Sequence, residues 1–176
     1  MSKFSSAFFM IMQNSKHELV VHPIEPLFDA DSRILILGSF PSVKSRETQF
    51  FYGHPQNRFW KLLSILFSEP LPKTIEEKKE FVLQHHIALW DVLASCEIIG
   101  SSDASILNPI PNDIKPILES TSITHIYTNG KTAYRYYMQY IFPTVGISAK
   151  CLPSTSPANA AWSIEKLEKA WSIILQ

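Results

Sequence analysis

The sequence predicts an α/β protein, a three-layer α/β/α sandwich around a central four-stranded parallel sheet. Two observations lead to this prediction. Short apolar runs with the length of buried strands recur along the chain. Helical patterns bounded by breaker residues lie between these runs, and this alternation is typical of a parallel sheet with helices on both faces.

Four segments are predicted to be strands: RILILG, IALWDVL, HIYTNG and GISAKCLP, at residues 33–38, 87–93, 125–130 and 146–153. Apolar spacing or terminal breaker residues predict helices between and after them. The helical segments are 57–67, 74–86, 114–120, 131–142 and the C-terminal stretch 160–176, which carries an apolar stripe.

Length and composition indicate one domain. A chain of 176 residues that is 45% hydrophobic is long enough for one sizeable core and short for two. We expect this domain over residues 31–176, preceded by a partly ordered N-terminal arm over residues 1–30. The apolar run near the start is too short to span a bilayer and lacks a clear cleavage site, so we expect a cytoplasmic protein without a membrane partner. We also expect it to be a monomer.

The charge balance limits the possible partners and cofactors. Lys plus Arg and Asp plus Glu number 16 each, which argues against a general nucleic-acid coat but allows an enzyme that grips a few phosphates. The chain has no G-x-G-x-x-G or Walker loop, and neither Cys96 nor Cys151 belongs to a C-x-x-C pair. No cofactor and no metal are predicted.

The chemistry is expected beyond the carboxyl ends of the strands, where ligands bind in such sheets. The segments that follow the four strands are GSFPS, DVLAS, TNGK and LPSTSPAN. From the second of these, Asp91 and Ser95 are candidates for the floor of a pocket.

Three of the motifs carry a family resemblance. GSFPS after the first strand, YGHPQNRFW at the next helix and LPSTSP before the last helix resemble the sequence landmarks of the uracil-DNA glycosylase superfamily. The nearest resemblance is to its hypoxanthine-DNA (deoxyinosine) glycosylase branch, which is related to the mismatch-specific uracil/thymine glycosylases. It runs from about Arg33 to the C-terminus and implies a monofunctional glycosylase that flips a deaminated base out of damaged DNA and hydrolyses its N-glycosidic bond.

The resemblance also implies a function for an aromatic ring of the stretch FFYGHPQNRFW, residues 50–60. The resemblance implies that the ring of Tyr52 stacks on the extruded base, while Gly53 lets the backbone approach the ligand closely. His54 is a candidate base or phosphate contact, or it orders the loop. Ordinary core packing is the alternative for Phe59 and Trp60.

Asn57 is the candidate catalytic residue, because an amide at a helix start can align water through its oxygen and donate through its nitrogen. The alternative is a simple helix cap. Relatives in the wider superfamily hold Asp or Asn in the middle of the first motif, where this chain has Phe40. Either the amide function has moved to Asn57, as the hypoxanthine branch implies, or the site is catalytically dead.

The remaining candidates belong to the pocket wall and the DNA contact. Gly38, Ser39 and Pro41 join Phe40 in the pocket wall, or they form only a tight turn. Asn129 contacts the base, or it forms an Asn-Gly turn or caps the next helix. The loop before the last helix is expected to bind the DNA backbone, or only to cap that helix. Its candidate residues are Pro153, Ser154, Thr155, Ser156, Pro157 and Asn159.

Two other functions remain open from the sequence. The chain is alternatively an inactive DNA-binding module of the same fold, which Phe40 would favour, or a hydrolase that binds a nucleoside or nucleotide. The resemblance implies that hypoxanthine is preferred, with uracil or mismatched thymine as further substrates, while the residues alone do not decide the damaged base.

Overall fold

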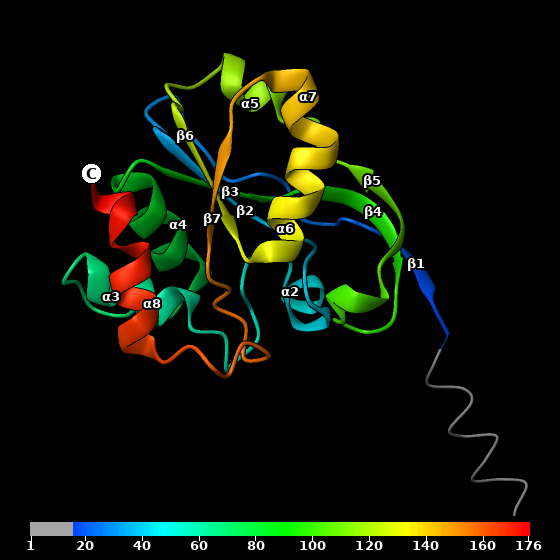
Figure 1. Ribbon diagram of the computed structural model, residues 1–176. Helices are drawn as coiled ribbons and strands as arrows, with labels where there is room; N and C mark the ends of the chain where they lie inside the picture. Colours follow the sequence, from blue (N-terminus) through cyan, green and yellow to red (C-terminus); the bar gives the residue numbers. More distant parts are fainter. Residues whose placement is uncertain (1–15) are drawn as a thin grey trace, which may run out of the picture.

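A four-stranded parallel sheet forms the centre of the protein (Figure 1). The computed structural model describes residues 16–176. The strands are β2 (Ile34–Gly38), β3 (Ile87–Asp91), β6 (His125–Asn129) and β7 (Ala149–Leu152), in the spatial order β3-β2-β6-β7. Every neighbouring pair is parallel, so the four predicted strands and the predicted sheet are confirmed.

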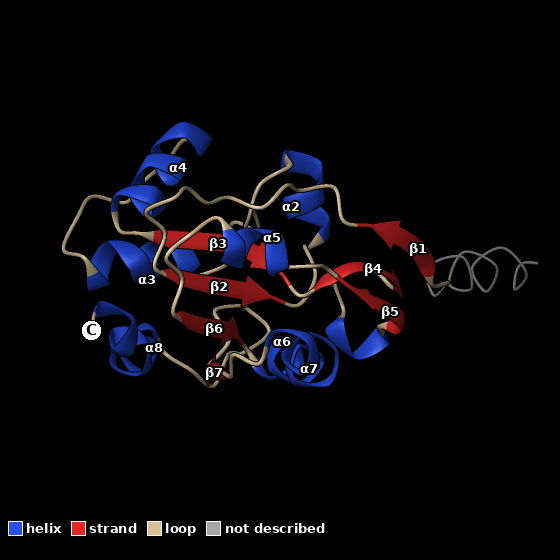
Figure 2. Cartoon of the chain, turned by 90° about the horizontal axis from the view of Figure 1, so that it is seen from above, coloured by secondary structure: helices blue, strands red, loops and turns tan. Residues whose placement is uncertain are grey.

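Helices cover both faces of this sheet, which gives the predicted three layers (Figure 2). One face carries α3 (Phe59–Leu66), α4 (Ile75–Gln84) and α8 (Ile164–Trp171). The other carries α5 (Lys115–Glu119), α6 (Lys131–Tyr136) and α7 (Phe142–Val145). A π-helical turn, Tyr137–Ile141, joins α6 to α7, and a 3-10 turn, Ser172–Leu175, follows α8.

The two faces of the sheet bury different residues of the same strand. In β2, Leu35 and Leu37 belong to the core under α5–α7, whereas Ile36 belongs to the core under α3, α4 and α8. All three are fully buried. A strand alternates its side chains between faces, so a continuous apolar run is the pattern required when both faces are covered.

A second sheet was not predicted. It is antiparallel and contains β1 (Glu18–Val21), β4 (Leu93–Ile98) and β5 (Leu107–Pro111), in the order β1-β4-β5. β4 begins two residues after β3 ends, within the run that the sequence analysis treated as one strand. β1 and β5 are short and mostly exposed, so they lack the apolar period that identifies buried strands. The short helix α2 (Val43–Thr48) and a 3-10 turn, Asp103–Ser105, were missed as well.

The segment expected as an N-terminal arm divides into two parts. Residues 1–15 lie outside the described residues. Within residues 16–30, strand β1 pairs with β4, Ile24 is buried in the core, and Leu27 bridges to Leu89 of β3. This segment therefore contributes to the core on the side of α3 and α4.

Two kinds of feature are absent from residues 16–176. No helix there is both long and apolar enough to cross a bilayer. Nor do three or more His, Cys, Asp or Glu side chains gather there in a way that would hold a metal ion.

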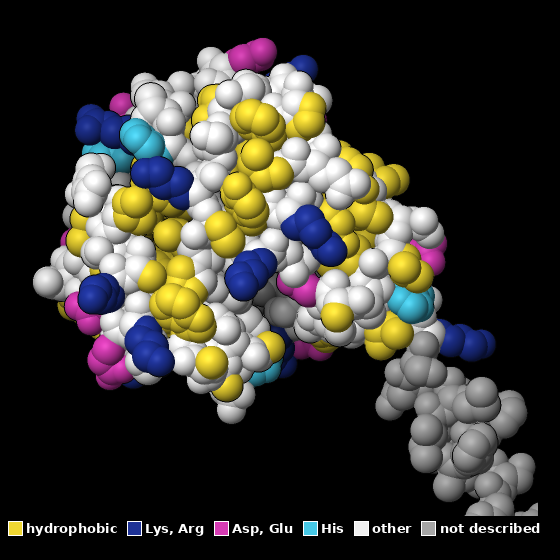
Figure 3. Space-filling model, viewed as in Figure 1, with side chains coloured by type: hydrophobic (Ala, Val, Ile, Leu, Met, Phe, Trp, Pro, Cys, Tyr) yellow, Lys and Arg dark blue, Asp and Glu magenta, His cyan; other side chains and the backbone are white. Residues whose placement is uncertain are grey.

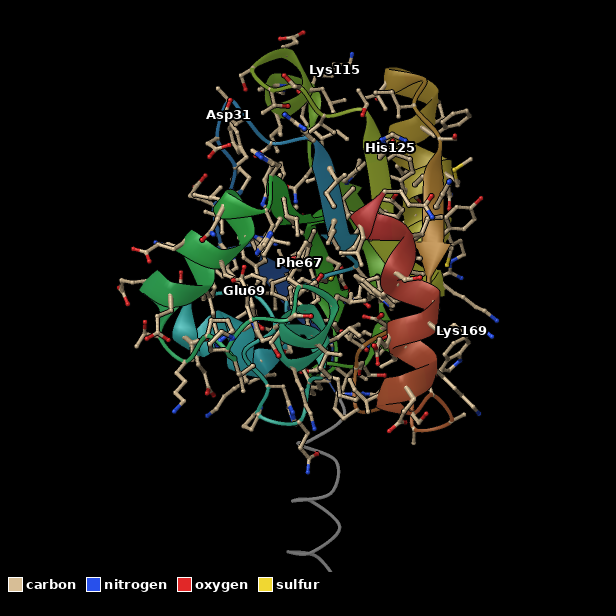
Figure 4. The ribbon with its side chains drawn as sticks, turned by 90° about the vertical axis from the view of Figure 1, so that its left-hand side faces the viewer. Asp31, Phe67, Glu69, Lys115, His125 and Lys169 are labelled. Atoms are coloured by element: carbon tan, nitrogen blue, oxygen red, sulfur yellow. The ribbon has the colours of Figure 1, made fainter. Side chains whose placement is uncertain are left out.

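Helix α8 shows how the covering helices attach to the sheet. Trp171 is fully buried and its indole Nε1 donates to the Pro153 carbonyl at 2.9 Å, which ties the helix to the end of β7. Lys169 is exposed on the same helix (Figure 4). Figure 4 also places Asp31, Lys115 and His125 toward the amino ends of the strands, opposite the loops that follow their carboxyl ends.

Replacement of Trp171 by alanine should lower the free energy of unfolding by about 3–5 kcal/mol, because it leaves a large cavity under α8. The Pro153 carbonyl also loses its donor. Urea unfolding would measure the change, with Lys169→Ala on the same helix as a control that stays within about 0.5 kcal/mol of the wild type. A loss below about 1 kcal/mol for Trp171→Ala would show that α8 contributes little to the core.

Candidate active site

An open cavity of about 290 Å³ lies at the carboxyl ends of the central strands. Gly38 ends β2, Asp91 ends β3 and Asn129 ends β6, and all three line it. The loops that the sequence analysis singled out therefore meet at one site. The candidate residues that line the cavity are Gly38, Ser39, Phe40, Pro41, Tyr52, His54, Asn57, Asn129, Ser154, Thr155, Ser156 and Pro157.

Three candidates and Ser95 do not line this cavity. Gly53 faces α2, where an added Cβ would lie 2.9 Å from Thr48 Oγ1, so its missing side chain makes room for a helix rather than for a ligand. Pro153 and Asn159 line an adjoining groove. Ser95 pairs with Val21 inside the antiparallel sheet.

A hydrogen-bond network through Thr155 joins three parts of the site. Thr155 is fully buried. Its backbone N–H donates to Asn129 Oδ1 at 2.9 Å, and its hydroxyl accepts from Asn129 Nδ2 at 2.9 Å. The same hydroxyl donates to Asn57 Oδ1 at 2.9 Å. The network connects the end of β6, the loop after β7 and Asn57, which lies two residues before α3.

The network determines which atom of Asn57 is free. Asn57 Oδ1 accepts from the Thr155 hydroxyl and from the Phe59 backbone N–H, at 2.9 and 3.0 Å, so both lone pairs are used. No described residue pairs with Asn57 Nδ2. Arg58, and not Asn57, is the N-cap residue of α3, so the simple helix-cap alternative is not what the structure has: Asn57 bonds the first N–H of the helix from one position further out. Its nitrogen, rather than its oxygen, is left for a ligand or a water.

Asn129 has a role that neither sequence alternative included. Its amide forms a two-bond pair with Thr155, and the N-cap position of α6 is Gly130, which has a φ of 99°. A Cβ on Gly130 would lie 3.0 Å from Ser154 Cβ, so glycine lets the loop after β7 approach β6 closely. Asn129 therefore positions that loop, whatever contact it makes with a ligand.

The guanidinium of Arg58 shapes the loop after β7. It donates to the carbonyls of Ser156 and Asn159 at 2.7 and 3.1 Å, to Thr155 at 3.3 Å, and also to Trp162. Carbonyls that converge on one cation do not align along a helix axis. The C-terminal helix consequently starts at Ile164, with Ser163 as its N-cap, and not at residue 160 as predicted.

The loop also differs from the predicted phosphate seat at a helix start. The N–H groups of Ser156 and Ala158 donate to the hydroxyl oxygens of Ser154 and Ser156, at 3.2 Å each, so they are already occupied. Asn159 Nδ2 donates to the Ser154 carbonyl at 2.9 Å. The hydroxyl hydrogens of the two serines remain as donors on this wall of the cavity.

The aromatic stretch divides into a core and one ring at the site. Phe50, Phe51, Phe59 and Trp60 are buried, which supports the core-packing interpretation of Phe59 and Trp60. Tyr52 lines the cavity and its ring stacks on Phe59, with centroids 3.9 Å apart and planes 24° apart. Phe59 thereby backs the tyrosine ring, which limits its movement.

The GSFPS segment, residues 38–42, forms another wall of the cavity, and one of its side chains is bonded to a carboxylate. The Ser39 hydroxyl donates to the Asp103 carboxylate at 2.9 Å, and burial raises the pKa of Asp103 above its usual value. The ring of Phe40 is buried and meets His22 edge-on at 5.8 Å. Phe40 thus forms an apolar wall of the cavity.

Two side chains of the site, His22 and Asp103, were missed by sequence reasoning, and Asp91 was proposed only for the floor. His22 Nε2 lies 2.7 Å from Asp91 Oδ2 and both side chains are nearly fully buried. His22 precedes the first predicted strand and Asp103 lies in a turn between strands of the second sheet. No motif marks either residue, because each reaches the site through long-range contacts.

Charge is not concentrated around the site. Figure 3 shows Lys and Arg side chains scattered over the visible face and separated by uncharged and hydrophobic surface. Among residues 16–176, two aspartates and no lysine or arginine line the cavity. Recognition of a ligand there depends on hydrogen bonding and shape more than on a positive field.

Comparisons with known proteins agree on one family. The model of the uracil DNA glycosylase superfamily matches residues 25–175. The chain is 35% identical over 152 residues to a hypoxanthine DNA glycosylase of Methanosarcina acetivorans, covering 85% of this chain and 94% of the relative. It is 30% identical over 149 residues to that of Methanosarcina barkeri, covering 84% and 92%. A solution NMR structure of a Methanosarcina acetivorans protein superposes with a TM-score of 0.74 at 29% identity, covering 90% of this chain and all of that one.

Thr155→Val should destabilise the protein by about 1–3 kcal/mol, because it leaves Asn129 Nδ2 without its buried acceptor and removes one donor to Asn57. Thr155→Ser keeps the hydroxyl and should cost less than half as much. Chemical denaturation of the two variants beside the wild type would compare them. Equal losses for Val and Ser would mean that the methyl group, and not the hydroxyl network, accounts for the stability.

Proposed function

Because the chain belongs to the uracil DNA glycosylase superfamily and is a DNA glycosylase, we propose that it excises deaminated bases from DNA, with hypoxanthine preferred. Uracil and mismatched thymine are the further candidate bases. The observation that carries the proposal is the convergence of Tyr52, Asn57 and the loop after β7 around one base-sized cavity.

The aromatic platform supports the step that holds the base. A flipped base presents a π-face, and stacking on an aromatic side chain contributes about 1–3 kcal/mol. Tyr52 lies on the cavity with Phe59 stacked behind it, so its position does not depend on the ligand. We assign the open face of this ring to the extruded base.

Asn57 supports the step that breaks the bond. If the sugar becomes cation-like as the base leaves, the reaction needs positioned dipoles more than a strong base. The Asn57 oxygen is held by Thr155 and Phe59, so the amide nitrogen is directed by bonds that exist before any ligand arrives. We assign this nitrogen to donate a hydrogen bond to the oxygen atom of the attacking water.

The loop after β7 supports the contact with the DNA backbone. Its serine hydroxyls line the cavity, and the hydrogen bonds from Arg58 to four of its carbonyls hold the loop in one conformation. A preorganised loop loses little conformational entropy when it presses on a strand. Pro157 stiffens the loop further, since its ring restricts the backbone φ angle.

A screen of defined lesions tests the proposal. Oligonucleotides with hypoxanthine, uracil, xanthine or mismatched thymine, single- and double-stranded, are incubated with the protein and then treated with alkali, beside free inosine. The expected result is fastest release of hypoxanthine, with strand cleavage only after alkali and no adduct trapped by borohydride, since no lysine in the described part of the chain lines the cavity. Binding without excision would support an inactive module, and cleavage of free inosine alone would support a nucleoside hydrolase.

Asn57→Ala should slow single-turnover excision of hypoxanthine roughly 10²–10³-fold, because it removes a preorganised transition-state contact. Stability should fall by only about 1–2 kcal/mol through the loss of the hydrogen bonds from Phe59 N–H and the Thr155 hydroxyl. Rapid-quench assays and thermal melting measure the two effects, with Gln56→Ala, a change of the exposed neighbouring residue, as the control. An Asn57→Ala protein that excises hypoxanthine at the wild-type rate would end the assignment of this residue.

A further inference from the structure

A buried carboxylate, that of Asp91, lines the candidate base pocket at the end of β3. Asp91 Oδ2 lies 2.7 Å from His22 Nε2, and the side chains of Asp91 and His22 are 7% and 3% exposed. The other ring nitrogen, His22 Nδ1, accepts from the Ile24 backbone N–H at 3.1 Å. In the neutral ring the proton therefore lies on Nε2, and His22 donates to the carboxylate.

The second oxygen of this carboxylate has no partner in the protein. None of the described residues donates a hydrogen bond to Asp91 Oδ1. This oxygen lies 2.3 Å from the point where a Cβ on Gly38 would be, so only glycine leaves room for it. Asp91 lines the cavity, which leaves Oδ1 as an acceptor for a bound ligand.

The Tyr52 hydroxyl is a second unsatisfied group at the same end. It is buried, it has no hydrogen-bond partner among residues 16–176, and it lies 3.6 Å from the same point beside Gly38. Burial raises the pKa of Tyr52, and the charge of Asp91 raises it further, so the hydroxyl remains protonated. A buried polar pocket end with unused acceptor and donor capacity is shaped for a polar edge of a ligand.

Deamination gives the base a hydrogen-bonding edge that matches this part of the pocket. Adenine N1 and cytosine N3 are hydrogen-bond acceptors, whereas deamination to hypoxanthine or uracil converts the same ring nitrogen into an N–H donor beside a carbonyl. An ionised carboxylate accepts hydrogen bonds and donates none. A carboxylate oxygen at the end of the pocket would therefore pair with the deaminated base and meet a lone pair on the parent base.

Resting on the proposed function, we propose that Asp91 determines specificity by accepting the ring N–H that deamination creates, and that His22 positions it. The donation from His22 uses Oδ2 and fixes the carboxylate so that Oδ1 faces the pocket. The pair excludes adenine and cytosine. Guanine and thymine carry a ring N–H of the same kind, so their exclusion depends on other features, such as pocket shape and the cost of flipping a well-paired base.

Asp91→Asn tests this assignment without changing the size of the side chain. His22 still presents an N–H, so the amide should turn its oxygen to His22 and its NH₂ group to the pocket. The pocket end then donates where it formerly accepted. Hypoxanthine excision should fall roughly 10²-fold or more, because the base N–H then faces a donor.

Affinity gives a second readout that separates specificity from general damage. Single-stranded oligonucleotides with 2′-fluorinated deoxyinosine or deoxyadenosine, whose sugars resist cleavage, would be compared by fluorescence anisotropy. The wild type should prefer the hypoxanthine strand, and Asp91→Asn should lower that preference at least ~10-fold. The matched control is Glu69→Gln, which removes the charge of another carboxylate paired with a histidine, His85 at 2.9 Å, and does not line the cavity; it should keep the preference within about 3-fold.

His22 is tested as a positioning residue by two variants. His22→Leu removes the donor and should lower the preference for hypoxanthine over adenine, whereas His22→Gln keeps an N–H and should restore part of it. The melting temperatures of both variants show whether a lower preference is instead caused by a loss of stability.

The outcomes separate this proposal from the one on which it rests. If the wild type does not excise hypoxanthine, the proposed function itself is contradicted. The assignment of Asp91 is overturned if the wild type excises hypoxanthine while Asp91→Asn keeps both the rate and the preference. It is equally overturned if Glu69→Gln lowers the preference as much, since total charge rather than position would then be responsible.

Discussion

The hydroxyl of Thr155 is the constraint on which the candidate site depends. It is fully buried and must be hydrogen-bonded, and its two partners, Asn129 and Asn57, come from segments far apart in the sequence. Satisfying this one group brings together the end of a central strand, the loop after the last strand and the start of α3. The orientation of the Asn57 amide is a consequence of that requirement.

The parallel sheet and Arg58 provide the frame around this network. Parallel strands bring their carboxyl ends to one edge, so Gly38, Asp91 and Asn129 are neighbours by topology before any side chain acts. Arg58 then binds four carbonyls of the loop after β7 and prevents it from starting a helix early. Rigid surroundings of this kind let hydrogen-bonding groups keep their positions without a ligand.

Sequence patterns predicted the parts of the molecule that depend on local periodicity. β2 and β3 are buried apolar runs, whereas β6 and the half-exposed edge strand β7 are less apolar, and the prediction of these two also used their bounding residues. All four central strands were foreseen, as was the sheet edge at which the cavity lies. Gly53 packs against α2, and two N–H groups expected to seat a phosphate in the loop before α8 are occupied within that loop, because a motif does not say which neighbour its atoms meet. His22 and Asp103 have no local signal at all. Their importance comes from contacts 69 and 64 residues away in the chain, which only the folded structure brings together.

A double-mutant cycle between Thr155 and Asn57 tests the central claim, that the buried hydroxyl positions the amide for excision. Single-turnover rates on hypoxanthine-containing DNA would be measured for Thr155→Val, Asn57→Ala and the double variant. If Thr155 acts through Asn57, its substitution should slow the wild type but have little further effect once the amide is gone. Rate losses that simply multiply in the double variant would show that the two residues act independently, and would contradict the account.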